Sequence, residues 1–285
     1  MGLKMIVMVK QVPDTHNISG EAMKPDGTVN RNALPAIFNP EDLNALEEAL
    51  KIKEKTGGFV TAISMGPQKA LDVLKECLYR GADNVVLVTD RRFAGADTLA
   101  TSYALKRAIE TVGKFDLVLC GRQAIDGDTA QVGPQIAEKL NINQLTCVSE
   151  VVDVDDKAIT VRRTVDDGHE IVKSCFPTLL TVTSDANKPR PPSVKRVMSY
   201  KNTTCDCCST DTEISCISET AGNLLECDVD YIDADPEKCG ISGSPTKVIK
   251  VKNVVLTTGN SKKIPNTESG IGDLIDELRN DNILG

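Results

Sequence analysis

Residues 59–89 read FVTAISMGPQKALDVLKECLYRGADNVVLVT, and this stretch indicates the architecture of the chain. Its first part, Phe59–Met65, is a short apolar run with the length and composition of a buried strand. Gln68–Arg80 follows with apolar residues at helical spacing, and Gly81 ends the helical pattern. A second strand-like run, Asn84–Thr89, comes next. A strand, a helix and a strand in this order predict two parallel strands joined by a crossover helix.

The same alternation continues on both sides of this unit. Strand-like runs occupy Lys4–Gln11 and Phe115–Cys120, and helix-like patterns occupy Asp97–Val112 and Thr129–Leu140. Four strand–helix repeats predict an α/β protein with a Rossmann-like, mostly parallel sheet covered by helices.

The helix that follows the first strand has a defined start in the sequence. Asn39 is a candidate N-cap, and Pro40 takes the first helical position, where its missing N–H costs nothing. Glu41 and Asp42 then favour the positive end of the helix dipole. Gly57-Gly58 is the predicted end.

The alternation of strands and helices ends after Gln144, where strand-like runs follow one another without helices between them. We expect antiparallel strands appended to the parallel sheet, at Leu145–Val154, Ala158–Arg163, Glu170–Cys175 and Thr178–Thr183. A polar, proline-rich loop at 185–192 then predicts a division into a nucleotide-binding α/β domain, residues 1–198, and a C-terminal arm, residues 199–285. The arm contains an acidic, cysteine-rich segment, a strand-like run at 247–256 and a terminal helix near 272–279.

Composition excludes several functional classes. The 285 residues include 33 Lys and Arg against 41 Asp and Glu, for a net charge of -8, and there is no Trp. An acidic chain with few aromatic residues is a poor binder of nucleic acid, so we expect no such partner. The sequence has neither a long uninterrupted apolar stretch nor a signal-peptide pattern. We therefore expect a cytoplasmic protein without membrane insertion.

Six of the ten cysteines crowd a short part of the arm, at positions Cys205, Cys207, Cys208, Cys216, Cys227 and Cys239. Zinc or an iron–sulfur cluster would need deprotonated thiolates, which the acidic neighbours disfavour, and the spacing matches no standard Cys-x-x-Cys pair. We expect reduced thiols and no metal, with a metal cluster and redox disulfides as the alternatives.

The loop at 121–134, GRQAIDGDTAQVGP, carries the strongest chemical signal. In doubly wound sheets, ligands bind beyond the carboxyl ends of the strands, and this loop follows a predicted strand and precedes a helix. Its glycines, hydroxyls and amides suit a pyrophosphate or ribose at a positive helix end. Asp126 and Asp128 are candidates for binding ribose hydroxyls, while Asp128 or Thr129 is alternatively a helix cap. Neither GxGxxG nor GxxxxGK[ST] occurs, so a standard dinucleotide fold and a P-loop are not supported.

Several separated motifs together resemble one known family. They are VKQVPDT at 9–15, MGP at 65–67, FAGADT at 93–98, the loop at 121–134, the region from VRR at 161–163 through DDGHE at 166–170, and GISGSPTKV at 240–248. In this order they resemble the beta subunit of electron transfer flavoproteins. The resemblance implies a heterodimer with a larger alpha subunit that carries electrons between dehydrogenases and a second acceptor.

The resemblance also implies a nucleotide in the crevice: AMP in simple electron carriers, or FAD in electron-bifurcating members. Carried over position by position, the contacts fall on Met8, Asn39, Pro40, Glu41, Asp42, Met65, Gly66, Gly121, Arg122, Gln123, Ile125, Asp126, Gly127, Asp128, Thr129, Ala130, Gln131, Val132, Gly133, Pro134 and Gln135.

The motifs at 13–15 and 126–129 look more like the bifurcating type. That type implies an FAD that accepts hydride from NADH, then sends one electron to ferredoxin and the other, through the alpha-subunit FAD, to an acyl-CoA or hydroxy-acid dehydrogenase. No side chain need act as a general acid or nucleophile, because the cofactor supplies the chemistry. Arg122 either favours the anionic reduced flavin or forms a solvent-facing salt bridge. Two rival functions remain: a carrier with structural AMP, and a non-redox adenine-nucleotide-binding protein.

Two further positions match partner-binding sites of the family. Glu170 corresponds to a position that approaches the alpha subunit, or it is simply an exposed hairpin carboxylate. Val194 corresponds to an apolar side chain that docks into the partner dehydrogenase, where family members often carry Leu. An exposed apolar anchor on a proline-stiffened loop is typical of an interface.

Overall fold

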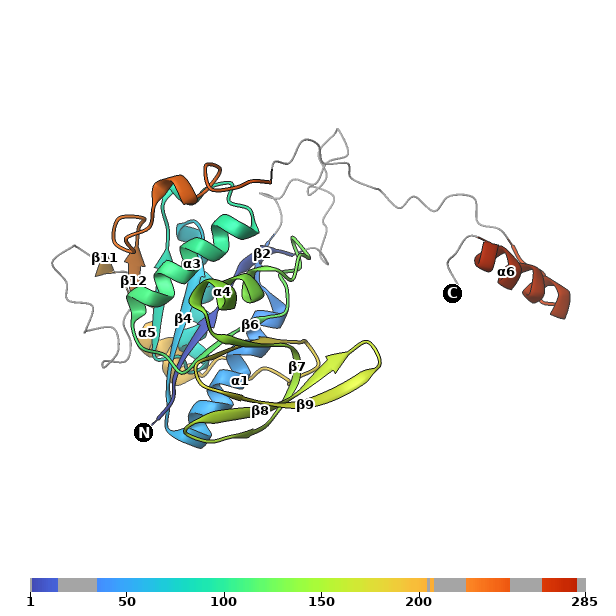
Figure 1. The fold of residues 1–285 in the computed structure, drawn as a ribbon, viewed down its shortest axis with the longest axis horizontal. Helices are drawn as coiled ribbons and strands as arrows, with labels where there is room; N and C mark the ends of the chain where they lie inside the picture. Colours follow the sequence, from blue (N-terminus) through green and yellow to red (C-terminus); the bar gives the residue numbers. More distant parts are fainter. Residues whose placement is uncertain (1, 15–34, 204–205, 208–223, 247–262, 281–285) are drawn as a thin grey trace.

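The protein is built on one large, mostly parallel sheet. A computed structural model describes residues 2–14, 35–203, 206–207, 224–246 and 263–280 (Figure 1). The sheet has ten strands in the order β11-β12-β5-β4-β1-β6-β10-β7-β8-β9. Their bounds are β1 Lys4–Met8, β4 Phe59–Met65, β5 Asn84–Val88, β6 Leu117–Gly121, β7 Asn143–Val154, β8 Ala158–Val165, β9 Gly168–Cys175, β10 Thr178–Val182, β11 Asp206–Cys207 and β12 Leu224–Cys227. A separate antiparallel pair joins β2 Gln11–Pro13 to β3 Ala36–Phe38.

Helices α1 Pro40–Thr56 and α2 Leu71–Arg80 cover one face of the sheet, and α3 Thr98–Val112 and α4 Val132–Leu140 cover the other, so that each pair buries a separate apolar cluster. The described chain also forms α5 Val194–Tyr200, which contacts α2, and α6 Glu268–Asn280. Leu46 of α1 and Leu74 of α2 pack in one cluster, whereas Ile109 of α3 and Ile136 of α4 pack in the other. This layering confirms the predicted α/β class with a Rossmann-like, mostly parallel sheet.

Glycines end the first two helices where the sequence predicts. Gly57 has a left-handed backbone, with φ of 70°, and its N–H donates to the carbonyl of Lys53 at 2.8 Å. Gly81 follows α2 with φ of 138°, and its N–H donates to the carbonyl of Cys77. A positive φ is available to glycine at little cost, so these two positions stop the helices.

The prediction for Thr178–Thr183 was wrong in direction. Strand β10 is not appended in antiparallel fashion but lies within the sheet, parallel to both β6 and β7. All five of its residues are buried, which is typical of a parallel strand covered on both faces. The antiparallel part is therefore β7–β8–β9, as predicted for those three strands.

Part of the predicted C-terminal arm joins the main sheet. Strand β12 pairs in parallel with β5, and Val229, Ile232 and Cys239 pack in the α3–α4 cluster. The predicted terminal helix is α6. The boundary at residue 198 stays a prediction, and the strand predicted at 247–256 lies outside the described residues.

The cysteine cluster is only partly within the described chain, because Cys205, Cys208 and Cys216 lie outside it. Cys239 is buried, its Sγ donates to the carbonyl of Asp235 at 3.3 Å, and burial raises the pKa of its thiol. Among the residues that the structure describes, no group of His, Cys, Asp or Glu side chains is placed to hold a metal ion. The state of the whole cluster stays a prediction.

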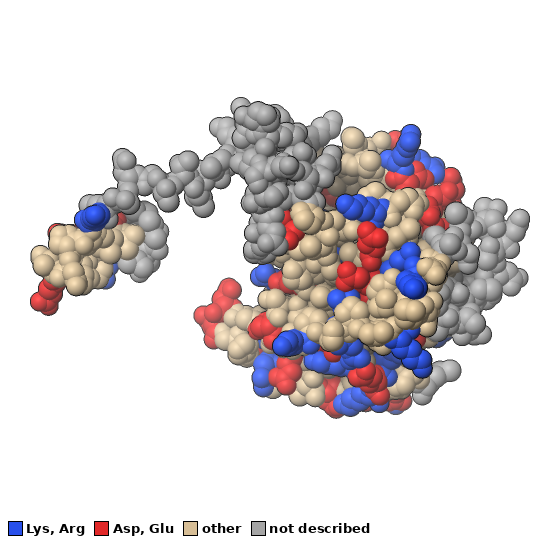
Figure 2. All heavy atoms as spheres, turned by 180° about the vertical axis from the view of Figure 1, so that it is seen from behind, with Lys and Arg blue, Asp and Glu red and all other residues tan. Residues whose placement is uncertain are grey.

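The surface in Figure 2 interleaves acidic and basic side chains, so that face offers no broad basic area for a phosphate backbone. Within the described ranges, no helix has the length and apolar character needed to cross a membrane.

Candidate functional site

The order of the strands places the topological switch point of the sheet between β1 and β6, where a ligand-binding crevice is expected. The chain passes from β1 outward to β4 and β5, then returns to β6 on the opposite side of β1. Such a reversal of direction is the topological switch point at which open α/β sheets bind ligands, beyond the carboxyl ends of the strands. Met8 and Gly121 end these two strands, and Met65 ends the neighbouring β4. The structure thus brings together three separated segments predicted to bind the nucleotide.

The start of α1 is bonded to the loop that follows β6. Asn39 stands at the N-cap position, as predicted, but its side chain makes no capping hydrogen bond. Its Nδ2 instead donates to the carbonyl of Gln123 at 2.9 Å, and its Oδ1 accepts from the N–H of Ile125 at 3.1 Å. The predicted capping role of this side chain is therefore wrong, because two backbone groups of the loop occupy its polar atoms.

Asp42 ties the two central strands together at their carboxyl ends. Its Oδ1 accepts from the N–H of Gly121 and its Oδ2 from the N–H of Lys10, both at 2.9 Å. Burial raises the pKa of the Asp42 carboxyl to about 7, although these backbone hydrogen bonds favour the charged form. A buried carboxyl is thus held in place by groups from both sides of the crevice.

Glu41 makes two contacts with the same loop. Its Oε2 accepts from the N–H of Gln123 at 2.9 Å, and its Oε1 pairs with Nη2 of Arg122 at 3.1 Å. The Arg122 side chain is 41 % exposed, yet its Nε is buried without a hydrogen-bond partner. Arg122, the predicted cation of this site, is therefore paired with Glu41, and its Nε–H has no hydrogen-bond partner.

The outer part of the loop is exposed and has unusual backbone geometry. Lys10 Nζ pairs with Asp126 at 2.6 Å, and Gln123 Nε2 donates to Asp128 Oδ1 at 3.0 Å. Asp128 and Ala130 have positive φ values of 48° and 52°. Such conformations cost energy in residues other than glycine and cluster at ligand-binding loops.

Helix α4 begins later than predicted. It starts at Val132 with Gln131 in the N-cap position, so neither Asp128 nor Thr129 caps it. The left-handed residue at Ala130 separates them from the helix. The first N–H groups of α4 have no acceptor within the helix, and this positive end follows the exposed loop directly.

Two glycines that flank the loop, Gly121 at the end of β6 and Gly133 in α4, allow close packing. A Cβ at Gly133 would lie 2.8 Å from Cys120 Sγ and 2.9 Å from Thr181 Cγ2, so α4 approaches the sheet closely. A Cβ at Gly121 would lie 2.6 Å from Asp42 Oδ1 and 2.7 Å from Asp42 N. Both positions need glycine because neighbouring segments already fill the space.

The packing at Gly121 gives a stability prediction. Gly121→Ala is expected to lower the free energy of unfolding by about 2 kcal/mol, because the new methyl overlaps the backbone of α1. Gly127→Ala is the matched control, since nothing lies within 4 Å of its Cβ position. Urea unfolding of the three proteins measures the difference. Equal losses in the two variants would contradict the packing argument.

Sequence reasoning missed three residues that help to build the site, Lys10, Thr98 and Ser102. Lys10 pairs with Asp126, and Thr98 donates from Oγ1 to Gln131 Oε1 at 2.9 Å. Ser102 likewise donates to Gln135 Oε1, so the starts of α3 and α4 lie side by side. The signal available for Thr98 was its place in the FAGADT motif, directly after the N-cap Asp97.

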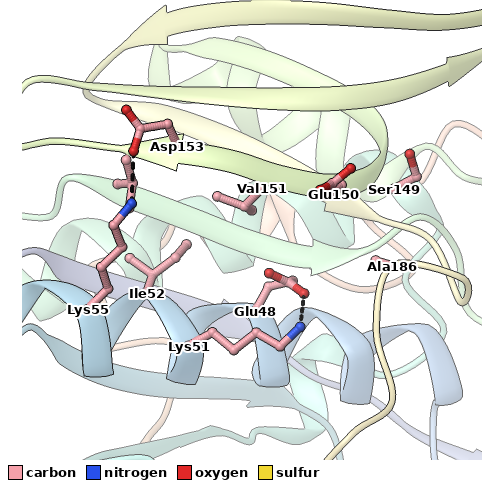
Figure 3. A pocket seen from close by; sticks show the side chains of 10 residues that line it. Glu48, Lys51, Ile52, Lys55, Ser149, Glu150, Val151, Asp153 and Ala186 are labelled. Carbon is pink, nitrogen blue, oxygen red and sulfur yellow. Dashed lines mark hydrogen bonds and ion pairs between the residues drawn. The ribbon is translucent and has the colours of Figure 1, made fainter.

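A separate hollow of about 420 Å³ lies between α1 and β7, away from the crevice (Figure 3). Lys51 pairs with Glu48 and Lys55 pairs with Asp153 along its wall. Because these charges already have partners, the hollow shows no convergent polar groups for a ligand.

The predicted partner-binding residues lie on exposed surfaces of two other elements. The side chain of Glu170 on β9 is 54 % exposed, and its Oε2 lies 3.7 Å from Nη1 of Arg163. Val194 begins α5 and is 78 % exposed. Whether either residue contacts a partner stays a prediction.

Comparisons with known proteins identify the family. The family profile described as "Electron transfer flavoprotein domain" matches residues 26–203. The chain is 41 % identical to the electron transfer flavoprotein subunit beta of Thermoanaerobacterium thermosaccharolyticum, over 99 % of this chain and 100 % of the relative. It is 39 % identical to the acryloyl-CoA reductase electron transfer subunit gamma of Anaerotignum propionicum and 38 % identical to the caffeyl-CoA reductase-Etf complex subunit CarD of Acetobacterium woodii, each over 99 % of this chain and 100 % of the relative.

These likenesses agree with an α/β sheet whose switch point carries a glycine- and acid-rich loop. The chain therefore belongs to the electron transfer flavoprotein family, among the relatives of its beta subunits.

Proposed function

We propose that this chain is the beta subunit of a flavin-based electron-bifurcating complex and that it holds FAD at the β1–β6 crevice. The observation that carries the proposal is the loop at 121–131, which is anchored at its start by α1 and exposed at its end beside the positive end of α4. Anchored backbone next to free helix amides fits the phosphates of a dinucleotide.

The relatives support an electron-transfer role with an acyl-CoA enzyme. Two of them are named as subunits that serve an acryloyl-CoA reductase and a caffeyl-CoA reductase. We infer that the partners of this chain are an alpha subunit, ferredoxin and a flavin-dependent dehydrogenase of the acyl-CoA type, with the hydroxy-acid type as the alternative.

Bound FAD would supply the redox chemistry, taking hydride from NADH and passing its electrons singly to two acceptors. The chain itself binds and orients. Loop 121–131 and the start of α4 hold the phosphates, while Met8 and Met65 provide apolar contacts at the strand ends. Arg122 pairs with Glu41, and the exposed part of its guanidinium would lie beside the ligand. A cation already paired with a carboxylate stabilises an added negative charge less than a free one would.

The nucleotide content of the purified heterodimer tests the proposal. We expect two FAD for each heterodimer and loss of flavin absorbance when NADH is added. One FAD together with one AMP would identify a simple electron carrier instead, and a colourless complex would identify a non-redox nucleotide-binding protein.

A further inference from the structure

The first residues of α1 make an ordered set of bonds with the loop after β6. The N–H groups of Gly121, Gln123 and Ile125 donate in turn to side-chain oxygens of Asp42, Glu41 and Asn39. Every second amide of the loop is therefore bound by a different side chain of one short segment. We call Asn39, Glu41 and Asp42 the α1 clamp.

The polar atoms of the α1 clamp are fully engaged. Both oxygens of Asp42 accept backbone N–H groups, and those of Glu41 accept one N–H and one guanidinium. The Oδ1 and Nδ2 atoms of Asn39 bond to Ile125 and Gln123. All three side chains are buried. A ligand that bonded to these atoms directly would have to displace hydrogen bonds inside the protein, which is costly for buried groups.

We infer that Asn39, Glu41 and Asp42 are positioning residues, which act on the nucleotide through loop 121–125 and not by contact with it. This inference rests on the proposed nucleotide site. It differs from the expectation that these side chains are themselves ligand contacts. The α1 clamp orders the loop when the protein folds. Binding of the ligand then costs less conformational entropy, because the loop amides are already in place.

Amide hydrogen exchange tests the clamp without any cofactor. The sample is the full heterodimer with its nucleotide removed, and the probe is the exchange of the amides at Gly121, Gln123 and Ile125. Asn39→Asp keeps the shape of the side chain but turns an acceptor toward the carbonyl of Gln123. We expect exchange in this segment to accelerate about tenfold, the factor that corresponds to one buried hydrogen bond.

Binding of FAD to the stripped heterodimer tests the consequence. We expect Asn39→Asp to raise the Kd for FAD about tenfold. At saturating FAD, its rate of reduction by NADH and the absorption spectrum of the flavin should equal those of the wild type. A residue that touches the flavin would change the spectrum or the saturated rate, so this division between affinity and rate distinguishes positioning from contact.

A second variant and a control keep the experiment decisive. Asp42→Asn replaces one of the two acceptor oxygens with an amide donor, should weaken FAD binding in the same way, and serves if Asn39→Asp does not fold. Glu54→Gln is the control on the same helix, because Glu54 pairs with Arg190 and not with the loop. It should leave both exchange and Kd unchanged.

The possible failures point to different conclusions. A wild-type heterodimer that binds neither FAD nor AMP would refute the proposed function, while the exchange measurement would still judge the clamp. Unchanged exchange in both variants would overturn the inference. So would faster exchange with unchanged Kd, or an altered flavin spectrum at saturation.

Discussion

The free energy of unfolding of this protein is expected to rise by about 2 kcal/mol when the pH falls from about 8 to about 5.5, because of Asp42. Burial raises the pKa of this carboxyl from an ordinary value of 3.8 to about 7 in the folded chain. Between these two values, the folded state binds a proton that the unfolded state does not. Stability therefore increases as the pH is lowered through 7 and stops increasing near the unfolded pKa.

Other titratable side chains interact with the Asp42 carboxyl. The positive charge of Lys10 favours its charged form, and the nearby thiols of Cys77 and Cys120 have pKa values that burial raises above the ordinary value. Carboxyls whose pKa values are lowered by partners, such as Glu54 with Arg190, lose their contribution only in more acidic solution.

Asp42→Asn provides the control for this prediction, because it removes the titrating group and keeps the size of the side chain. As the pH falls from about 8 to about 5.5, urea unfolding should show the stability of the wild type rising by about 2 kcal/mol relative to that of the variant. Parallel profiles would show that Asp42 is not the source. Protonation should also release one of the two N–H groups that the carboxylate accepts. The protection factor of the Gly121 or the Lys10 amide, which is corrected for the slower intrinsic exchange at lower pH, should therefore fall at pH 5.5 even as global stability rises.

The sequence predicts correctly those elements that are determined by local residues. Gly57 and Gly81 end helices because each adopts a positive φ, and Phe59–Met65 forms a strand with the predicted bounds. Local pattern could not reveal that β10 inserts between β6 and β7, because strand direction is set by pairing with distant residues.

The candidate site shows the same division between local and distant information. The segments around Asn39 and Gly121 were both predicted, yet a capping rule assigned the Asn39 side chain to its own helix. Its actual partners, Gln123 and Ile125, are more than eighty positions away. The side chain serves the loop because burial leaves the loop carbonyls and amides in need of partners.

Helix α5 presents an apolar face on a firmly anchored segment. Arg190 pairs with Glu47 at 2.8 Å, and Arg196 Nη1 donates to the carbonyls of Leu78 and Ala82, both at 3.3 Å. Val194 and Met198, four residues apart on the helix, remain 78 % and 62 % exposed. A rigid support for exposed apolar side chains reduces the entropy lost on binding, as expected of an interface anchor.

Val194→Asp is accordingly expected to raise the KM for the dehydrogenase that copurifies with the complex about 30-fold, the effect of losing one central apolar anchor. Reduction of the flavin by NADH should not change, because Val194 lies on α5 and the crevice lies at the carboxyl ends of β1 and β6. Val194→Leu should keep or improve electron transfer to the dehydrogenase, since it retains an apolar side chain.

Val152→Asp, which adds the same charge at another exposed apolar position on β7, controls for charge alone. Steady-state electron transfer from NADH to the dehydrogenase measures all three variants. An equal loss in Val194→Asp and Val152→Asp would assign the effect to charge, and no loss in Val194→Asp would place the docking surface elsewhere.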